Sequence, residues 1–188
     1  MKKSLLLIAA LAGTLMASAQ IAEVGPRVQV NAAAAQRMAL RAAQNTPVIE
    51  ADNVLLTGPD GAVTRIHPVD CAGYLWASVS PDGSRLMFVA AGKGLYITDL
   101  NGNVERVLSE IEFPVWVSDS VIAGTVSTDD GHQFSSSQIV LTRTDGTETQ
   151  AITTPDSFSF EPVAAADGSA LVYRTIDGIY YLVSLTLK

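Results

Sequence analysis

The sequence predicts an all-β protein, a β-propeller-like array of four-stranded blades that is either partial or four-bladed, with a short N-terminal helix. Three segments align with one another residue for residue, and their turn glycines Gly61, Gly102 and Gly146 stand 41 and 44 residues apart. That spacing is typical of one propeller blade and not of a helical repeat unit. The aligned segments are residues 54–66, 95–107 and 139–151.

A second alignment adds further strands to each repeat. Residues 77–83, 114–120 and 162–168 align as short strands that enter tight turns, and an apolar run follows each turn. The apolar runs are continuous, which suits strands covered on both faces, as the inner strands of stacked blades are.

The turns between these strands carry a recurrent dipeptide. Six Asp-Gly steps and one Asn-Gly step at Asn101 lie between residues 60 and 178. Such dipeptides favour type I′ hairpin turns, which need positive φ at both central residues. A calcium-binding role is not indicated, because no stretch has the spaced carboxylates of a calcium loop.

The strand count leaves open how the array closes. Residues 53–67 supply the last two strands of one blade, residues 74–109 and 113–153 supply two complete blades, and residues 160–185 supply the first three strands of another. That makes about thirteen strands, fewer than the roughly sixteen of a four-bladed ring. Two solutions remain open: a homodimer that completes a ring, and a four-bladed monomer that uses residues 20–52 as substitute strands.

The N-terminal region is organised differently from the repeats. Lys2 and Lys3 precede an apolar run, and small residues end at Ala19, which predicts a signal peptide over residues 1–19 that is cleaved after Ala19. The run is too short to span a bilayer, so we expect a periplasmic or secreted protein with no membrane span.

Residues 20–52 form the segment between this leader and the repeat region at 53–188. Residues 31–44 are rich in alanine and other strong helix formers, with Asn31 as the expected N-cap and Pro47 beyond the end. The alternating residues 27–30 are a candidate for an extra strand at a blade edge.

Charge and cysteine content restrict the partners. Removing the two leader lysines changes the formal net charge from −7 to −9, and the basic residues are scattered, so nucleic acid is not an expected partner. Cys71 is the single cysteine and cannot pair within its chain. We interpret it as a half-buried small apolar residue at a strand start.

The stretch Ser80-Pro81-Asp82-Gly83, followed by the apolar strand to Ala90 and then by Gly94 to Gly102, resembles the repeat of the TolB-type β-propeller family. The likeness covers roughly residues 53–187 and is weaker in the repeats at 113–153 and 160–185, where Pro-Asp-Gly is not kept. The resemblance implies an exported propeller that serves as a platform for a protein partner in the cell envelope. The chain departs from the six-bladed ring with a separate N-terminal domain that the resemblance implies, because its strands are too few for six blades and residues 20–52 are too short to match such a domain.

No group of residues indicates a reaction. His67 is expected at a strand end and His132 in a loop, and no Gly-x-Ser-x-Gly nucleophile elbow occurs. We therefore assign no catalytic, cofactor-binding or metal-binding residues and predict no enzyme activity. Asp129, Asp130 and His132 form the densest group of metal-ligand types, but a solvated hairpin tip is the favoured interpretation.

Most aromatic residues align with core positions of the repeats, which leaves Trp76 and Phe134 as the candidates for exposed contacts. The favoured function is that of an exported, non-enzymatic module for protein–protein interaction in the periplasm or cell envelope. The alternative is a ligand-binding, carbohydrate-binding or hydrolytic site at a propeller face around Asp129, Asp130 and His132.

Overall fold

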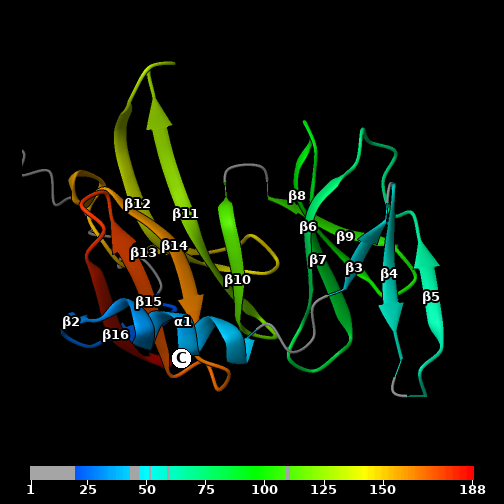
Figure 1. The fold of residues 1–188 in the computed structure, drawn as a ribbon, viewed down its shortest axis with the longest axis horizontal. Helices are drawn as coiled ribbons and strands as arrows, with labels where there is room; N and C mark the ends of the chain where they lie inside the picture. The colour runs from blue at the N-terminus through cyan, green and yellow to red at the C-terminus, as the bar shows by residue number, and fades with distance from the viewer. Residues whose placement is uncertain (1–19, 43–46, 51, 59, 109–110) are drawn as a thin grey trace, which may run out of the picture.

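The computed structural model describes residues 20–42, 47–50, 52–58, 60–108 and 111–188. In these residues the chain is mainly antiparallel β-structure, folded into four sheets that lie side by side, with one α-helix (Figure 1). The prediction of an all-β, propeller-like array with a short N-terminal helix is confirmed. Each sheet is called a blade below and is numbered from the first to the fourth along the repeats. The predicted signal peptide at residues 1–19 lies outside the described residues.

The elements have the following bounds. The first blade contains β3 (Val48–Glu50), β4 (Asn53–Thr57) and β5 (Val63–Ile66); the second contains β6 (Tyr74–Val79), β7 (Arg85–Ala90), β8 (Gly94–Asp99) and β9 (Val104–Leu108). The third contains β10 (Glu112–Ser118), β11 (Val121–Asp129), β12 (Phe134–Arg143) and β13 (Thr149–Ala151). The fourth contains β14 (Ser159–Ala164), β15 (Ala170–Thr175) and β16 (Tyr180–Leu187), joined by β1 (Ala22–Val24) and β2 (Val28–Val30). The helices are α1 (Ala32–Ala42) and the 3₁₀ turn η2 (Pro155–Ser157).

The hairpin turns lie where the Asp-Gly steps predicted them, but their type differs from the prediction. Gly83 has φ +75° and donates its N–H to the Ser80 carbonyl, whereas Asp82 is not among the described residues with positive φ. A type I′ turn would need positive φ at both positions, so the type I′ assignment is wrong. The Asp side chain favours the observed turn instead, because Asp82 Oδ1 accepts the N–H of Ser84 two residues on.

The Asp82 carboxylate gives this turn a pH dependence. Hydrogen bonds from the Ser80 hydroxyl and then from Ser84 lower the pKa of Asp82 from 3.8 to about 2. Because the folded-state pKa is depressed, its stabilisation is complete above the unfolded value and is lost as the pH falls from 3.8 through about 2. Asp82→Asn should therefore lower the free energy of unfolding at neutral pH, by about 1 kcal/mol or less since the group is exposed. Urea unfolding at neutral and acid pH checks this; a deficit of the same size at both would contradict it.

The two N-terminal strands complete the outer edge of the fourth blade. β2 pairs antiparallel with the start of β16, with Val28 opposite Leu182, and β1 pairs with the end of β16, with Ala22 opposite Leu187. Between them Gly25 donates its N–H to the Ser184 carbonyl at 2.9 Å, so the edge stays bonded across the break. The extra strand expected at residues 27–30 is confirmed, and β1 extends it.

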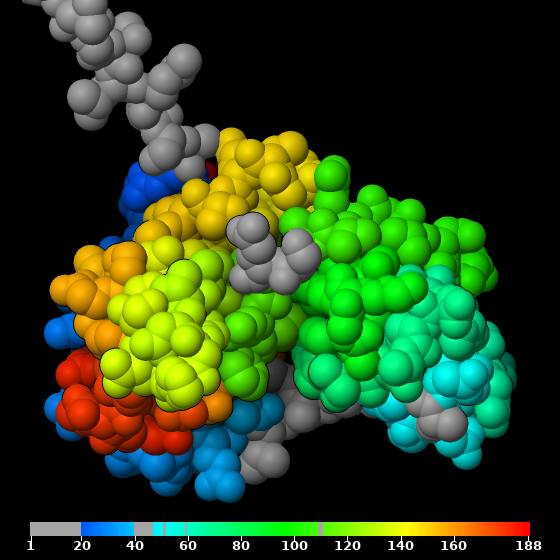
Figure 2. All heavy atoms as spheres, turned by 90° about the horizontal axis from the view of Figure 1, so that it is seen from above, coloured from blue at the N-terminus to red at the C-terminus, as the bar shows by residue number. Residues whose placement is uncertain are grey.

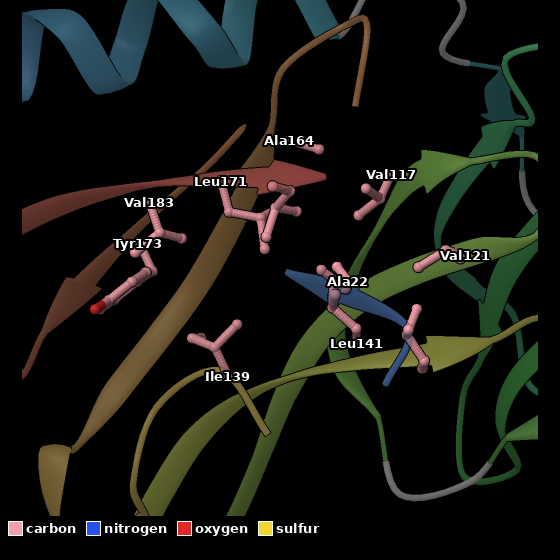
Figure 3. Packing of buried hydrophobic residues seen from close by; sticks show 12 residues of the cluster. Ala22, Val117, Val121, Ile139, Leu141, Ala164, Leu171, Tyr173 and Val183 are labelled. Carbon is pink, nitrogen blue, oxygen red and sulfur yellow. The ribbon is translucent and has the colours of Figure 1, made fainter. Parts of the chain in front are cut away.

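The core consists of three hydrophobic clusters, one between each pair of consecutive blades. The largest joins the third and fourth blades and includes Ile21 and Ala22, both 0% exposed (Figure 3). The cluster between the second and third blades is formed by Met87, Leu95, Ile97, Trp116 and Ile122, and the one between the first and second includes Val54, Ile66, Tyr74 and Phe88. Each blade is thus stabilised through its neighbours, as in repeat proteins generally.

Helix α1 begins where the sequence placed it and covers the outward face of the fourth blade. The Asn31 side chain caps it by accepting the N–H of Ala34 at 2.9 Å. The helix packs on β14 and β15, and Figure 3 shows it on the far side of these strands from the core cluster. Ala35 is buried in this contact region, and small alanine side chains permit such a close approach.

The array is an open arc in the described residues. The first and fourth blades lie at opposite ends of the molecule in Figure 1, and no hydrophobic cluster of the described chain joins them. Residues 20–52 do supply substitute strands, as the four-bladed monomer required. These strands join the first and fourth blades, however, and do not close a ring. At the other end of the arc, Glu50 and Arg65 form an exposed ion pair of 2.7 Å across the first blade.

Arg85 ties the second blade to the third. Its guanidinium donates to the Asp119 carbonyl and, at 3.2 Å, to the Thr144 hydroxyl, and it lies 5.7 Å from the centre of the Trp116 ring. Arg85→Ala should lower the free energy of unfolding by about 1–3 kcal/mol, because the buried Thr144 hydroxyl and the half-buried Asp119 carbonyl lose a charged donor. Arg85→Lys should recover only part of this, since lysine lacks the planar fork.

Urea unfolding followed by tryptophan fluorescence measures both Arg85 variants. Arg65→Ala is the matched control, because Arg65 makes an exposed ion pair, which contributes about 1 kcal/mol or less. Equal losses at Arg85 and Arg65 would contradict the assigned role of Arg85.

Candidate functional site

One end of the blades gathers exposed apolar side chains. At this end β6, β10 and β14 begin and the β7–β8, β11–β12 and β15–β16 hairpins turn, as the strand registers show; we call it the hairpin end. Half of the ten exposed large apolar side chains of the described residues lie here. They are Leu75, Phe113, Phe134, Ile176 and Ile179.

The predicted group Asp129, Asp130 and His132 lies together at the tip of the β11–β12 hairpin, with all three residues exposed. Asp129 Oδ1 accepts the N–H of Gly131, and Asp130 Oδ1 accepts the N–H of both His132 and Gln133. The bonds from the Gln133 and His132 amides lower the pKa of Asp130. These carboxylates therefore hold the turn, and the described residues contain no cluster of three His, Cys, Asp or Glu side chains placed to hold a metal ion.

Phe134, the other exposed candidate of the hairpin, lies where the third blade meets the fourth. Phe134 is 46% exposed, yet the centre of its ring lies 5.1 Å from the centre of the buried Phe160 ring. The Arg174 guanidinium lies 5.8 Å from the centre of the same Phe160 ring. The exposed Phe134 ring therefore packs against Phe160, a buried residue of the fourth blade. In Figure 2 the yellow-green atoms of this hairpin lie beside the orange atoms of the fourth blade.

Arg174 and Glu161 form a bidentate ion pair next to Phe160. Arg174 Nε and Nη2 donate to the two carboxylate oxygens of Glu161 at 2.6 and 2.8 Å. The hydrogen bonds from Arg174 lower the pKa of Glu161, so it is an anion at neutral pH. The Glu161 backbone N–H donates to Thr125 Oγ1 at 3.2 Å, which fixes the carboxylate beside β11.

Phe113 is the exposed aromatic residue that sequence reasoning missed. It is 55% exposed, has φ +48°, and lies in a register shift between Glu112 and Val115. Glu161 has φ +52° in the equivalent shift of β14. Both residues precede a proline, and this shared dipeptide position is the signal that marks the two bulges in the sequence.

Trp76 aligns with Phe113 in the repeat but lies differently. It is half-buried and packs against the cluster between the second and third blades, so the exposed neighbour is Leu75, at 71%. His67 follows β5 in the first blade, and its Nδ1 contacts the Asp52 carbonyl. His132 lies in the third blade, so the two histidines belong to different blades. Cys71 is half-buried in the loop before β6, not in the strand itself.

The hairpin end of the third and fourth blades is also acidic. The starts of β10 and β14, η2 and the two hairpins contain one guanidinium, that of Arg174, which Glu161 already binds. The Arg27 guanidinium, next to β2 at the outer edge of the fourth blade, lies over the Tyr181 ring. The carboxylates of the same segments are Glu112, Asp129, Asp130, Asp156, Glu161 and Asp177. Exposed aromatic rings therefore lie among anionic groups.

The fold defines a β-propeller-like repeat protein, and comparison with known proteins adds little to that class. No family model and no curated protein matches the chain. Among solved structures, the chain is similar to the tricorn protease (17% identity, TM-score 0.44, 65% of this chain and 14% of that one). It is also similar to TolB from Acinetobacter baumannii (16% identity, TM-score 0.43, 76% of this chain and 43% of that one). The chain thus spans less than half the length of either, and these values assign it neither a family nor an activity.

Within the described residues, no helix has both the length and the apolar character needed to cross a bilayer.

Proposed function

We propose that the chain is an exported, non-enzymatic propeller-type module of the TolB-like kind that mediates protein–protein interaction in the periplasm or cell envelope. The predicted leader at residues 1–19 supports export. The repeat pattern around Ser80 to Gly102 supports the TolB-like assignment.

The observation that carries the proposal is that half of the ten exposed large apolar side chains of the described residues lie at the hairpin end. Surface apolar side chains scattered singly need no explanation, but a set gathered at one end of the blades and bordered by polar residues is typical of an interaction site. A catalytic or metal-binding role for Asp129 and Asp130 is less well supported, because one oxygen of each carboxylate holds the turn amides and the described residues group no three metal-ligand side chains.

Site-specific photo-crosslinking in the native host tests the proposal. A photoreactive residue is placed in turn at Leu75, Phe113 and Phe134, and at Val63 and Val104 on other surfaces, all of which are exposed. The expected result is a discrete adduct with one protein that saturates as the partner is overproduced. Absence of any adduct at all five positions, in cells where the mature protein accumulates in the envelope fraction, would overturn the proposal. Mass spectrometry of the mature protein checks the leader, with Gln20 expected as the first residue.

A further inference from the structure

We propose that the hairpin end of the third and fourth blades is a docking surface for a partner segment that alternates arginine or lysine with apolar residues. The surface consists of Glu112, Phe113, Asp129, Phe134 and Glu161, and we call it the aromatic–acidic patch. The proposal rests on the proposed function and names the site and the chemistry of the partner.

Contacts on both sides of β11 bring the residues of the patch together. Glu112 Oε2 accepts the hydroxyl of Ser127 at 2.8 Å, and the Glu161 N–H bonds to Thr125, two residues earlier on the same strand. Phe134 reaches the fourth blade through Phe160, and Asp129 lies opposite Phe134 in the strand register. Two exposed rings are thus bordered by carboxylates from three strands.

The charge of the surface selects the partner. The only guanidinium of these segments, that of Arg174, is bound to Glu161, which leaves the other carboxylates without a cation from the described hairpin-end segments. An anionic or purely apolar partner would leave these carboxylates desolvated and unpaired, which costs free energy. A segment with positive charges next to apolar groups matches both features of the patch.

The protein itself contains the contact that such a segment would make. The Arg174 guanidinium lies over the Phe160 ring and forks onto the Glu161 carboxylate. The Arg85 guanidinium also lies over a ring, that of Trp116, but its hydrogen bonds go to a carbonyl and a hydroxyl. A partner arginine over Phe134, with Asp129 or Glu112 beside it, would repeat this arrangement at the surface. Cation–π contact and a charge-assisted hydrogen bond then act together.

Binding of a defined probe tests the chemistry. The probe is a short fluorescent peptide that alternates arginine with leucine, titrated with the mature protein, residues 20–188, and followed by fluorescence anisotropy. Phe134→Ala, and the double variant Glu112→Gln with Asp129→Asn, should each weaken binding roughly tenfold. A peptide with glutamate in place of arginine should not bind.

Matched controls separate the patch from the general negative charge of the protein. Val63→Ser removes an apolar side chain of similar exposure from the first blade, and Glu23→Gln removes an exposed carboxylate on β1. Each should change binding by less than about twofold. Equal losses in patch and control variants would overturn the proposal, as would displacement of the peptide by a neutral oligosaccharide, which would indicate a carbohydrate site.

The crosslinking experiment distinguishes failure of this proposal from failure of the proposed function. Adducts at Phe113 and Phe134 that map to a basic, apolar segment of the captured protein support the patch. Adducts only at Val63 or Val104 would overturn the patch and leave the interaction function standing, whereas absence of adducts at every position would overturn both.

Discussion

Replacing Ile21 with alanine is expected to lower the free energy of unfolding by about 2–5 kcal/mol. Ile21 precedes the repeats, yet its side chain is 0% exposed in the cluster between the third and fourth blades. Its carbonyl also accepts the N–H of Lys188 at 3.0 Å. The substitution leaves a cavity between two blades, and the rigid strands around it limit how far the site can collapse. Urea unfolding of residues 20–188, followed by the fluorescence of Trp76 and Trp116, measures the loss.

Val28→Ala is the control for Ile21, because Val28 lies in β2 of the same segment but is 54% exposed. Its effect should stay below about 1 kcal/mol. If both variants were as stable as the parent protein, the N-terminal strands would not belong to the cooperative unit, and the assigned role of β1 would be wrong.

Gly168→Ala is expected to destabilise the protein by several kcal/mol, about as much as an overpacked core. Gly168 has φ +71°, and a Cβ there would lie 2.3 Å from the Val117 carbonyl oxygen. That oxygen belongs to the backbone of β10 in the neighbouring blade, so it can move only if the third and fourth blades separate. The free energy of unfolding of this variant is measured as for Ile21→Ala.

Gly178→Ala isolates the backbone contribution in the Gly168 experiment. Gly178 has φ +76°, also follows an aspartate in a hairpin turn, and has no atom within 4 Å of the added Cβ. It should therefore lose only about 1–2 kcal/mol, the cost of placing alanine in a left-handed conformation. Similar losses at the two glycines would show that the close approach of Gly168 to Val117 contributes nothing.

The repeats were predictable because each carries its own local pattern. Strands such as β7 and β8 alternate or run apolar between turn residues, and the two alignments place them within a residue or two of their observed bounds. The turn type was not predictable from Asp-Gly alone. Glycine adopts positive φ both in type I′ turns and in the turns observed in this protein, so the Asp-Gly dipeptide does not distinguish the two.

How the N-terminal strands complete the terminal blades was harder to predict, because β1 and β2 pair with a strand that is distant in the sequence. β3, at residues 48–50, is too short to show a pattern, and β1 acquires its role only by pairing with β16. For the candidate site, the hairpin could be located from the repeat alignment, and Phe134 was a candidate because it does not align with a core position. Phe113 could not, because the bulge before Pro114 reverses the alternation that an ordinary strand would follow.

The pairing of β1 with β16 also sets an order of events in folding. Residues 22 and 187 are partners, so the strand that is synthesised first must wait until nearly the whole repeat region has followed. Contacts between residues so far apart form slowly, because the intervening chain must be ordered first. Until then the edge of the fourth blade stays unpaired and open to other strands. The last step of folding is therefore the pairing of the first-made strand with the last-made one, and it decides when the fourth blade becomes complete.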